Sequence, residues 1–318
     1  MRQFKIRFCE NLNKYLICST AFMLLGIIAL AVFGIDLDIN FKGGSRFTYS
    51  YVNTEESKLD MDEVKSIVDE ALGVKATVTS STGVSDSSSY INITTTDTNA
   101  ISTEKQAALT TALAEAYPDN SIELGDANTV NPSVAGSFFL KSITAVLLAG
   151  ALIVVFVAFR FRNNGGFRAG ICAFIALIHD VLIAFFFCVI FRLQIDTNFM
   201  AVVLTIFGYS INDTVVVYDR IRENRRYYPD ETLREATNKS INQVLTRTIT
   251  TSLTTVVAIV VIGVVAELNG ITSLRTFAIP MAVGSISGCY SSDCISVPLW
   301  VKWNEYLEAH PKKTKKSK

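Results

Sequence analysis

The chain has 318 residues, of which half are hydrophobic, and its formal net charge is zero. A mean hydropathy of +0.35 over this length favours a membrane protein over a soluble protein. The six cysteines lie within or close to apolar runs and form no CxxC or Cys/His ligand spacing, which argues against a disulfide-stapled domain and against a metal or other cofactor.

The first predicted element is a membrane anchor at 15–36, since a spanning helix needs about 20 mostly apolar residues. It follows the basic segment MRQFKIRF, which resembles the start of a signal peptide. Because the apolar stretch is long and no A-x-A-like cleavage site follows it, we expect the anchor to be retained. Residues 1–14 then form a short N-terminal segment.

The polar and acidic stretch 37–134 has the pattern of a separate α+β domain. Alternating residues predict strands, and helical periodicity behind capping residues such as Asp60 predicts two helices. The strands are expected at 46–52, 74–80, 89–96 and 121–127, and the helices at 61–72 and 102–117. The order β-α-β-β-α-β is that of a ferredoxin-like module. It carries no catalytic constellation, phosphate-binding loop or basic-aromatic surface, so we expect an interaction domain that binds no nucleic acid.

Five more apolar runs are long enough to span a membrane. They lie at 138–160, 167–191, 198–218, 244–268 and 273–301. The chain is therefore predicted to be a polytopic α-helical membrane protein with six transmembrane helices and the ferredoxin-like domain between helices one and two. The loop 219–243 is expected to hold a short amphipathic helix on the membrane surface, and 302–318 forms a basic tail.

Basic residues mark one side of this predicted bundle. They precede span one, connect spans two and three and spans four and five, and end the chain as KKTKKSK. The alternate short loops hold only Arg192 or no basic residue. The positive-inside rule makes the basic side cytoplasmic. Both termini are then predicted to be cytoplasmic, and 37–134 extracytoplasmic.

Two opposite charges are predicted to lie inside the membrane at similar depths. Counting from the boundary near Arg220 puts Asp213 about 10 Å deep, and counting from 242 puts Arg247 about 8 Å deep. We expect them to be partners on consecutive antiparallel helices, with Asn212 as a polar flank. Because intramembrane ionisable groups are functional by default, a proton or ion relay is favoured over a structural ion pair that fixes helix register.

Further ionisable side chains occur in the third and sixth predicted spans. His179 and Asp180 are expected near mid-membrane, where a relay and a satisfied buried pair explain them equally well. Asp293 is expected about 10 Å from the inner face. A purely structural interpretation is a hydrogen bond to its neighbours Tyr290, Ser291 and Ser292. Small residues nearby suit close helix packing, namely Gly284, Ser285, Ser287 and Gly288.

The segment GYSINDTVVVYDRIREN (208–224) resembles the most diagnostic motif of the SecF family, within the RND (resistance-nodulation-division) superfamily. Supporting matches run from the first span to the last, at FKGG (41–44), ALIHD (176–180), LTRTITTSLTT (245–255) and SGCYSS (287–292). Structural positions in these motifs are Gly43, Gly44, Gly208, Tyr209 and Gly288. Two departures occur: Asn40 stands where the family usually has an acidic residue, and Asp293 with Cys294 stands where it is normally apolar.

The resemblance implies a subunit of the bacterial SecDF protein-export complex, located in the cell membrane and without enzyme activity. In that family, SecF pairs with SecD, whose six spans complete a pseudo-symmetric channel. The pair uses the proton-motive force to pull exported polypeptide out of the SecYEG translocon after SecA has driven it through. The residues matching Asp213 and Arg247 belong to the proton pathway of that family. The sequence of this chain does not distinguish H⁺ from Na⁺ as the coupling ion.

Two alternatives belong to other functional classes. One is an RND-type exporter of lipids or small hydrophobic molecules, but such proteins typically carry both six-span halves in one chain, which favours the export subunit. The other is a scaffold that only stabilises the translocon, in which case an Asp213→Asn substitution would leave export intact.

Overall fold

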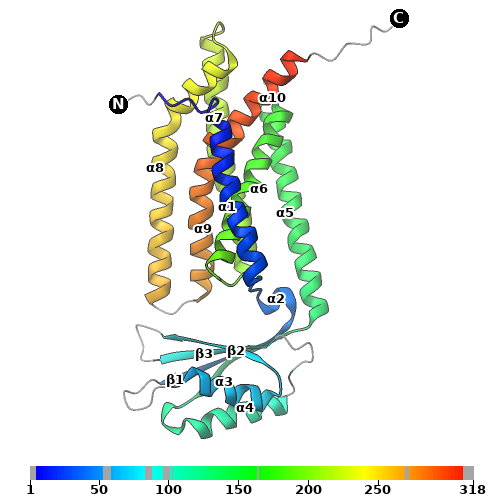
Figure 1. The fold of residues 1–318 in the computed structure, drawn as a ribbon, viewed down its shortest axis with the longest axis vertical. Coiled ribbons are helices and arrows are strands. Elements are labelled where there is room, and N and C mark those ends of the chain that lie inside the picture. The colour runs from blue at the N-terminus through cyan, green and yellow to red at the C-terminus, as the bar shows by residue number, and fades with distance from the viewer. Residues whose placement is uncertain are drawn as a thin grey trace, which may run out of the picture.

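The computed structural model describes residues 5–52, 59–82, 88–95, 101, 103–162, 165–268 and 272–310. A bundle of long helices stands on a small α/β domain (Figure 1). Helix α1 (Leu12–Phe33) begins, and α10 (Val297–Ala309) ends, at the end of the bundle farthest from that domain. The KKTKKSK segment of the predicted tail 302–318 lies outside the described residues.

Within the described residues, five helices are long and apolar enough to cross a membrane. They are α1, α5 (Pro132–Arg160), α6 (Gly166–Ile190), α7 (Thr197–Tyr227) and α8 (Leu233–Leu268). They correspond to the first five predicted spans. Helices α6 and α7 are the most buried of the five, whereas α5 exposes apolar side chains such as Leu148, Val155 and Phe159. A lipid environment suits such a surface, because exposed apolar area is unfavourable in water.

The sixth predicted span, 273–301, consists of three pieces. Helix α9 (Thr272–Ser291) passes into a π-helical turn, η3 (Ser292–Ser296), and continues as α10. Pro298 has no backbone N–H and its ring crowds the carbonyl of Cys294, so the regular pattern of α-helical hydrogen bonds cannot pass through this point. The wider turn that results contains Asp293.

The predicted surface helix in the loop 219–243 is absent as a separate element. Instead α7 continues to Tyr227, and α8 already begins at Leu233. Thr232 and Glu235 form a reciprocal cap at this start: the Thr232 backbone N–H and hydroxyl donate to Glu235 at 3.0 and 2.8 Å, and the Glu235 N–H donates back at 3.3 Å. No Gly or Pro follows until Gly263, so nothing ends the helix at the predicted span boundary.

The small domain is a four-stranded antiparallel sheet with two helices on one face. Its strands are β1 (Gly44–Val52), β2 (Ala76–Thr82), β3 (Ser88–Thr95) and β4 (Glu123–Val130), in the spatial order β2-β3-β1-β4. The helices are α3 (Met61–Leu72) and α4 (Thr103–Ala116), with the short α2 (Ile39–Lys42) before β1 and a single turn, η1 (Pro118–Asn120), before β4. The predicted order of strands and helices is thus observed.

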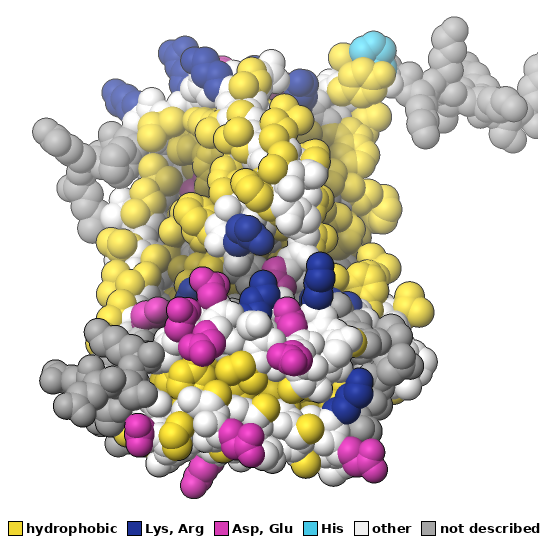
Figure 2. Space-filling model, turned by 60° about the horizontal axis from the view of Figure 1, so that its bottom comes forward, with side chains coloured by type: hydrophobic (Ala, Val, Ile, Leu, Met, Phe, Trp, Pro, Cys, Tyr) yellow, Lys and Arg dark blue, Asp and Glu magenta, His cyan; other side chains and the backbone are white. Residues whose placement is uncertain are grey.

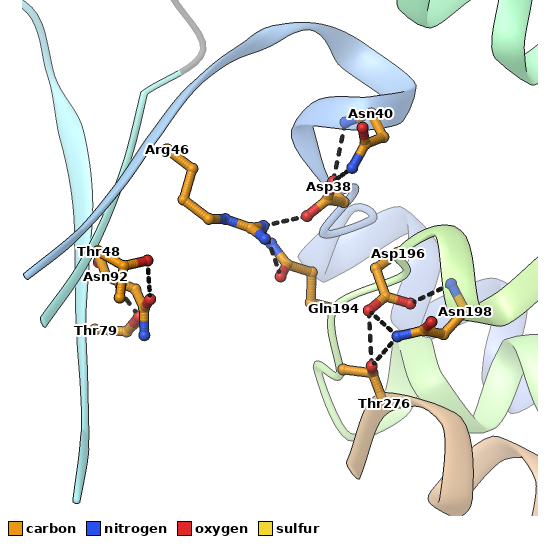
Figure 3. Close-up of polar contacts among 10 residues, drawn as sticks. All are labelled: Asp38, Asn40, Arg46, Thr48, Thr79, Asn92, Gln194, Asp196, Asn198 and Thr276. Carbon is orange, nitrogen blue, oxygen red and sulfur yellow. Dashed lines mark hydrogen bonds and ion pairs between the residues drawn. The ribbon is translucent and has the colours of Figure 1, made fainter. Parts of the chain in front are cut away.

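Alternation along the strands separates the two faces of this sheet. Phe47, Tyr49 and Ile91 are buried under α3 and α4, on the face away from the bundle (Figure 1). The opposite face carries polar side chains such as Thr48 and Asn92 and is turned towards the bundle (Figure 3). The domain therefore buries one face in its own core and offers the other face to the membrane helices.

Charges are segregated along the long axis of the molecule. Figure 2 shows Lys and Arg gathered at the end of the bundle away from the domain, and most of the Asp and Glu over the domain. We call the end of the bundle where Lys and Arg gather the basic end. It contains the turn between α7 and α8 and the start of α1.

Candidate functional site

The centre of the bundle holds a fully buried carboxylate, Asp180 of α6. It accepts hydrogen bonds from Ser210 of α7 at 2.8 Å, and from Ser287 and Ser291 of α9 at 2.7 and 2.8 Å. Nδ1 of His179 lies 3.1 Å from the same carboxylate. Asp180 is thereby a junction between three helices, whereas Nε2 of His179 is buried without a hydrogen-bond partner among the described residues.

The three serines were not predicted as partners of Asp180. Ser287 and Ser291 are four residues apart, which places their hydroxyls on one face of α9. That spacing in the sequence indicated that the two hydroxyls could bind one partner. The sequence could not show that this face of α9 is turned towards α6.

Close approach of α9 to α7 brings the serines to Asp180. A Cβ atom on Gly284 would lie 2.1 Å from Cδ1 of Ile206, and one on Gly288 would lie 3.0 Å from Cβ of Ser210. A larger residue at either position would therefore force Ile206 or Ser210 to move. The predicted close packing by small residues in this span is confirmed.

Asp213 lies one turn beyond Ser210 on α7, about 60° around the helix and next to α8, and is 4 % exposed. Its hydrogen-bond donor is Ser252 of α8, at 3.5 Å, the limit of such a contact. Ser252 in turn accepts a hydrogen bond from the Tyr209 hydroxyl at 3.1 Å. Asp213 is thus buried nearly as deeply as Asp180 but is held by a much weaker set of donors.

The predicted ion pair between Asp213 and Arg247 is absent. The register of α8 places Ser252, not Arg247, opposite Asp213. Ser252 and Arg247 are five residues apart and lie about 140° apart around α8. The prediction counted from an assumed helix edge at 242, whereas α8 begins at Leu233.

Arg247 faces a hollow of about 1250 Å³ at the basic end of the bundle. Five arginines and two carboxylates line it, namely Arg220, Arg222, Arg225, Arg226, Arg247, Asp219 and Glu223. Arg220 pairs with Glu223 at 2.6 Å, and Arg222 pairs with Asp219 at 3.0 Å. The hollow is therefore strongly cationic and joins the surface to the level of Arg247.

Asn212 and Gly208 are both exposed on the outer side of α7. Nothing lies within 4 Å of a Cβ atom placed on Gly208. The structure therefore does not bring these two positions together with Asp213, although Tyr209 does join its network through Ser252.

Asp293 is 3 % exposed, and its Oδ1 is buried without a hydrogen-bond partner among the described residues. The predicted hydrogen bonds to its neighbours are not formed. Ser291 donates to Asp180, Ser292 donates to the Ser210 carbonyl at 3.3 Å, and the Tyr290 hydroxyl donates to the Tyr15 carbonyl at 2.8 Å.

A polar network ties the small domain to the bundle (Figure 3). Arg46 of β1 forms an ion pair with Asp38 and donates to Gln194 at 3.3 Å. Asp38 also accepts from the Asn40 backbone N–H at 2.9 Å and from its side-chain amide at 2.6 Å. Asn40, which departs from the family motif, therefore supports a neighbouring carboxylate.

Backbone contacts reinforce this link between domain and bundle. Leu37 and Ile195 form a parallel bridge, and the Ile195 N–H donates to the Asp36 carbonyl at 2.8 Å. The next residue, Asp196, caps α7 and accepts from Thr276 of α9 at 2.7 Å.

Two motif glycines turn the chain at the start of this network. Gly43 and Gly44 have φ values of +82° and +128°, and a Cβ atom on Gly43 would lie 2.8 Å from Pro132. They allow α2 to pass directly into β1.

A cleft of about 420 Å³ separates the polar sheet face from the bundle. Thr48 and Asn92 line it from the sheet, and Arg192 and Arg275 line it from the bundle. Across the described ranges, no group of three or more His, Cys, Asp or Glu side chains is placed to hold a metal ion.

Comparison with known proteins agrees with this architecture. Residues 109–306 match the family model "Protein export membrane protein SecD/SecF, C-terminal". The SecF translocase subunit of Alicyclobacillus acidocaldarius is 35% identical over 91% of this chain and 90% of its own length. The SecDF subunit of Bacillus subtilis is 31% identical over 93% of this chain but only 38% of its own length.

A crystal structure of SecDF, a translocon-associated membrane protein from a Thermus species, superimposes with a TM-score of 0.77 and 28% identity. The match covers 95% of this chain and 39% of that one. The chain spans well under half of these SecDF proteins and nearly the whole of SecF. The chain belongs to the SecD/SecF family of protein-export membrane proteins.

Proposed function

We propose that the chain is a SecF-type protein translocase subunit that uses the proton-motive force, together with SecD, to promote late steps of Sec-dependent export. The observation that carries this proposal is Asp213, a buried carboxylate with one long hydrogen bond, in a chain that matches SecF subunits along its length. A carboxylate held so weakly gains little by staying charged, so it can take up and release a proton.

The proposed membrane placement has six spans, with α9 as the sixth, and both termini in the cytoplasm. The gathering of Lys and Arg at the basic end supports this orientation (Figure 2). The small domain is then a ferredoxin-like module on the extracytoplasmic side, as its sheet order and its position at the opposite end support. The basic hollow opens to the cytoplasm.

SecD is the proposed partner, with SecYEG and the exported polypeptide as further ones. The chain corresponds to 39% of the SecDF structure, and SecD is proposed to supply the part that this chain does not match. The exposed polar Asn212 on α7 is costly against lipid and suits a protein neighbour there. This face of α7 is the proposed contact with SecD.

Protons can supply enough energy for such work. One charge that crosses the membrane yields about 2.3 kcal/mol per 100 mV, which is several times the thermal energy of about 0.6 kcal/mol. This biases a two-state conformational equilibrium substantially. Asp213 is the proposed proton carrier, and Arg247 lines the basic hollow.

The test is Asp213→Asn in vesicles that contain the complete translocon and SecD. Expression and assembly should stay normal, the extra export that a proton gradient adds should be lost, and the ATP-driven fraction should be unchanged. Asp219→Asn is the matched control, because it removes a half-exposed carboxylate from the same helix. An Asp213→Asn variant that still responds fully to the gradient would support the scaffold alternative instead.

A further inference from the structure

The basic hollow holds more positive charge than its own carboxylates neutralise. Five arginines and two carboxylates line it, which leaves a net charge of +3. Both carboxylates already pair with arginines, at 2.6 and 3.0 Å. The other three arginines, Arg225, Arg226 and Arg247, are exposed and form no ion pair among the described residues. Three guanidinium groups are therefore available to an anion.

The hollow extends along the helices from the end of α7 into the bundle. Gln243 of α8 accepts from Arg220 at 2.7 Å and from Asn224 at 2.8 Å, which sets α8 beside α7 at this level. Arg247 lies four residues, or about 6 Å, deeper in the bundle, and Arg226 lies about as far from this level towards the surface. The two cations are thus separated by about 12 Å along the helix axes. The headgroup region of one membrane leaflet is about 5–8 Å thick, so the hollow is deep enough to cross it.

A strip of α8 continues from Arg247 along the same side of the helix. Val261 lies 14 residues further on, which is nearly four full turns, and its side chain is exposed. Between these two residues, the hydroxyls of Thr250 and Thr254 donate to carbonyls of their own helix at 2.7 and 3.0 Å. They need no partner from outside, so a hydrocarbon chain can lie against the strip without leaving a polar group unsatisfied. The strip therefore has a cation at one end and an apolar surface at the other.

We propose that the basic hollow binds an anionic phospholipid of the cytoplasmic leaflet, with its headgroup between Arg226 and Arg247 and an acyl chain along the strip of α8. Arginine suits this role, because its planar guanidinium forms paired hydrogen bonds to phosphate oxygens. Basic pockets between transmembrane helices on the cytoplasmic side bind such headgroups. Val216 and Val244 give the hollow an apolar wall as well. The inference rests on the proposed membrane placement of the bundle, and not on proton transfer by Asp213.

Native mass spectrometry of the complete complex with SecD tests the proposal. The complex is stripped of lipid in detergent and then titrated with phosphatidylglycerol, with phosphatidylethanolamine or with inorganic phosphate. We expect a saturable site that prefers phosphatidylglycerol, and we expect inorganic phosphate not to displace the bound lipid. Displacement by inorganic phosphate would assign the hollow to a free anion. A complex without such a site would mean that SecD covers the hollow, and either result would overturn the proposal.

A pair of charge-matched variants locates the site. Arg225→Gln combined with Arg226→Gln should weaken phosphatidylglycerol binding about 30-fold, since two surface cations are lost. Lysine at both positions should weaken it less, because lysine keeps the charge but not the paired hydrogen bonds. Arg162→Gln combined with Arg168→Gln removes the same charge on either side of the connection between α5 and α6, outside the hollow, and should leave binding unchanged.

Equal losses for the two double glutamine variants would contradict the proposal, because general surface charge would then attract the lipid. Asp213→Asn should bind phosphatidylglycerol like the wild type. The lipid site and the proposed proton coupling can therefore fail separately: lipid binding reports on the first, and the export response to a proton gradient reports on the second.

Discussion

Two carboxylate regions lie within a few turns of each other in the bundle, and they are built differently. Asp180 is surrounded by hydroxyls from α7 and α9, each within 2.8 Å. Asp213 and Asp293 are almost as deeply buried, yet the first has one contact at 3.5 Å and the second has an oxygen without a partner. The two regions therefore differ in the number of hydrogen-bond donors and not in the depth of burial.

Hydrogen-bond energetics explain this difference. Each hydroxyl that donates to Asp180 joins α6 to α7 or α9, so the three hydrogen bonds hold these helices together. Interhelical hydrogen bonds in membranes contribute about 0.6 kcal/mol on average and up to about 1.7 kcal/mol each. Asp180 should therefore be important for stability, while Asp213 and Asp293 should be nearly dispensable for it.

Asp180→Ala should have the largest effect on stability. It removes three interhelical hydrogen bonds, which amounts to a loss of about 2–5 kcal/mol. We expect a lower midpoint of thermal unfolding in detergent and a reduced amount of protein in the membrane. Asp293→Ala is the matched comparison, and its midpoint should lie close to that of the wild type or above it. Equal losses for the two variants would contradict the contrast between the regions.

Gly284→Ala should destabilise by a smaller amount, because it pushes α9 away from α7 and so loosens the serines around Asp180. The added Cβ would lie 2.1 Å from Ile206, and overpacking of this kind costs about 1–3 kcal/mol. Gly208→Ala is the control, since its Cβ would meet nothing within 4 Å, and it should be neutral or slightly stabilising.

A second substitution checks the cause of the Gly284→Ala effect. If the clash is with Ile206, combining Gly284→Ala with Ile206→Ala should cost less than the sum of the two single losses. Strict additivity in thermal unfolding would mean that the two side chains do not meet.

Ser291→Ala should have a small effect, about 0.6–1.7 kcal/mol, because Asp180 keeps its other donors. Ser252→Ala removes a hydroxyl that stands 3.5 Å from Asp213 and should cost less than about 0.6 kcal/mol. Both losses would be measured from unfolding midpoints of the full chain in one detergent. A larger loss of stability for Ser252→Ala than for Ser291→Ala would mean that Asp213 has a structural role like that of Asp180.

Local patterns in the sequence predicted much of the fold. The helix at 61–72 begins and ends as expected, and Asp60 caps it by accepting from the Asp62 N–H at 2.9 Å. Helical periodicity, alternation and capping depend on neighbouring residues, so they are readable from the chain itself. The same holds for the first five spans, whose length and apolar composition are local properties.

The candidate site was predicted less completely, because it depends on how helices are placed against one another. The choice of Arg247 as partner for Asp213 failed on the register of α8, and Ser252 was missed for the same reason. The π-helical turn at Asp293 was also missed, although Pro298 is a local sequence signal for an irregular helix. Residue types were informative in each case, but their pairing was set by packing between distant segments.

The bridge between Leu37 and Ile195 joins the start of α7 to the segment that leads into the domain, so a tilt of α7 would move that segment. The helix has 31 residues and is therefore about 46 Å long, and Asp213 lies about 21 Å from its basic end. If that end is the fulcrum, any sideways displacement at Asp213 is about doubled where the helix meets the domain. A shift of about 2 Å at the acid then becomes about 4 Å at the base of the sheet, close to the spacing of about 4.8 Å between neighbouring strands. The domain end of α7 thus lies next to the segment that carries Asp38, and Asp38 is paired with Arg46 of the sheet (Figure 3).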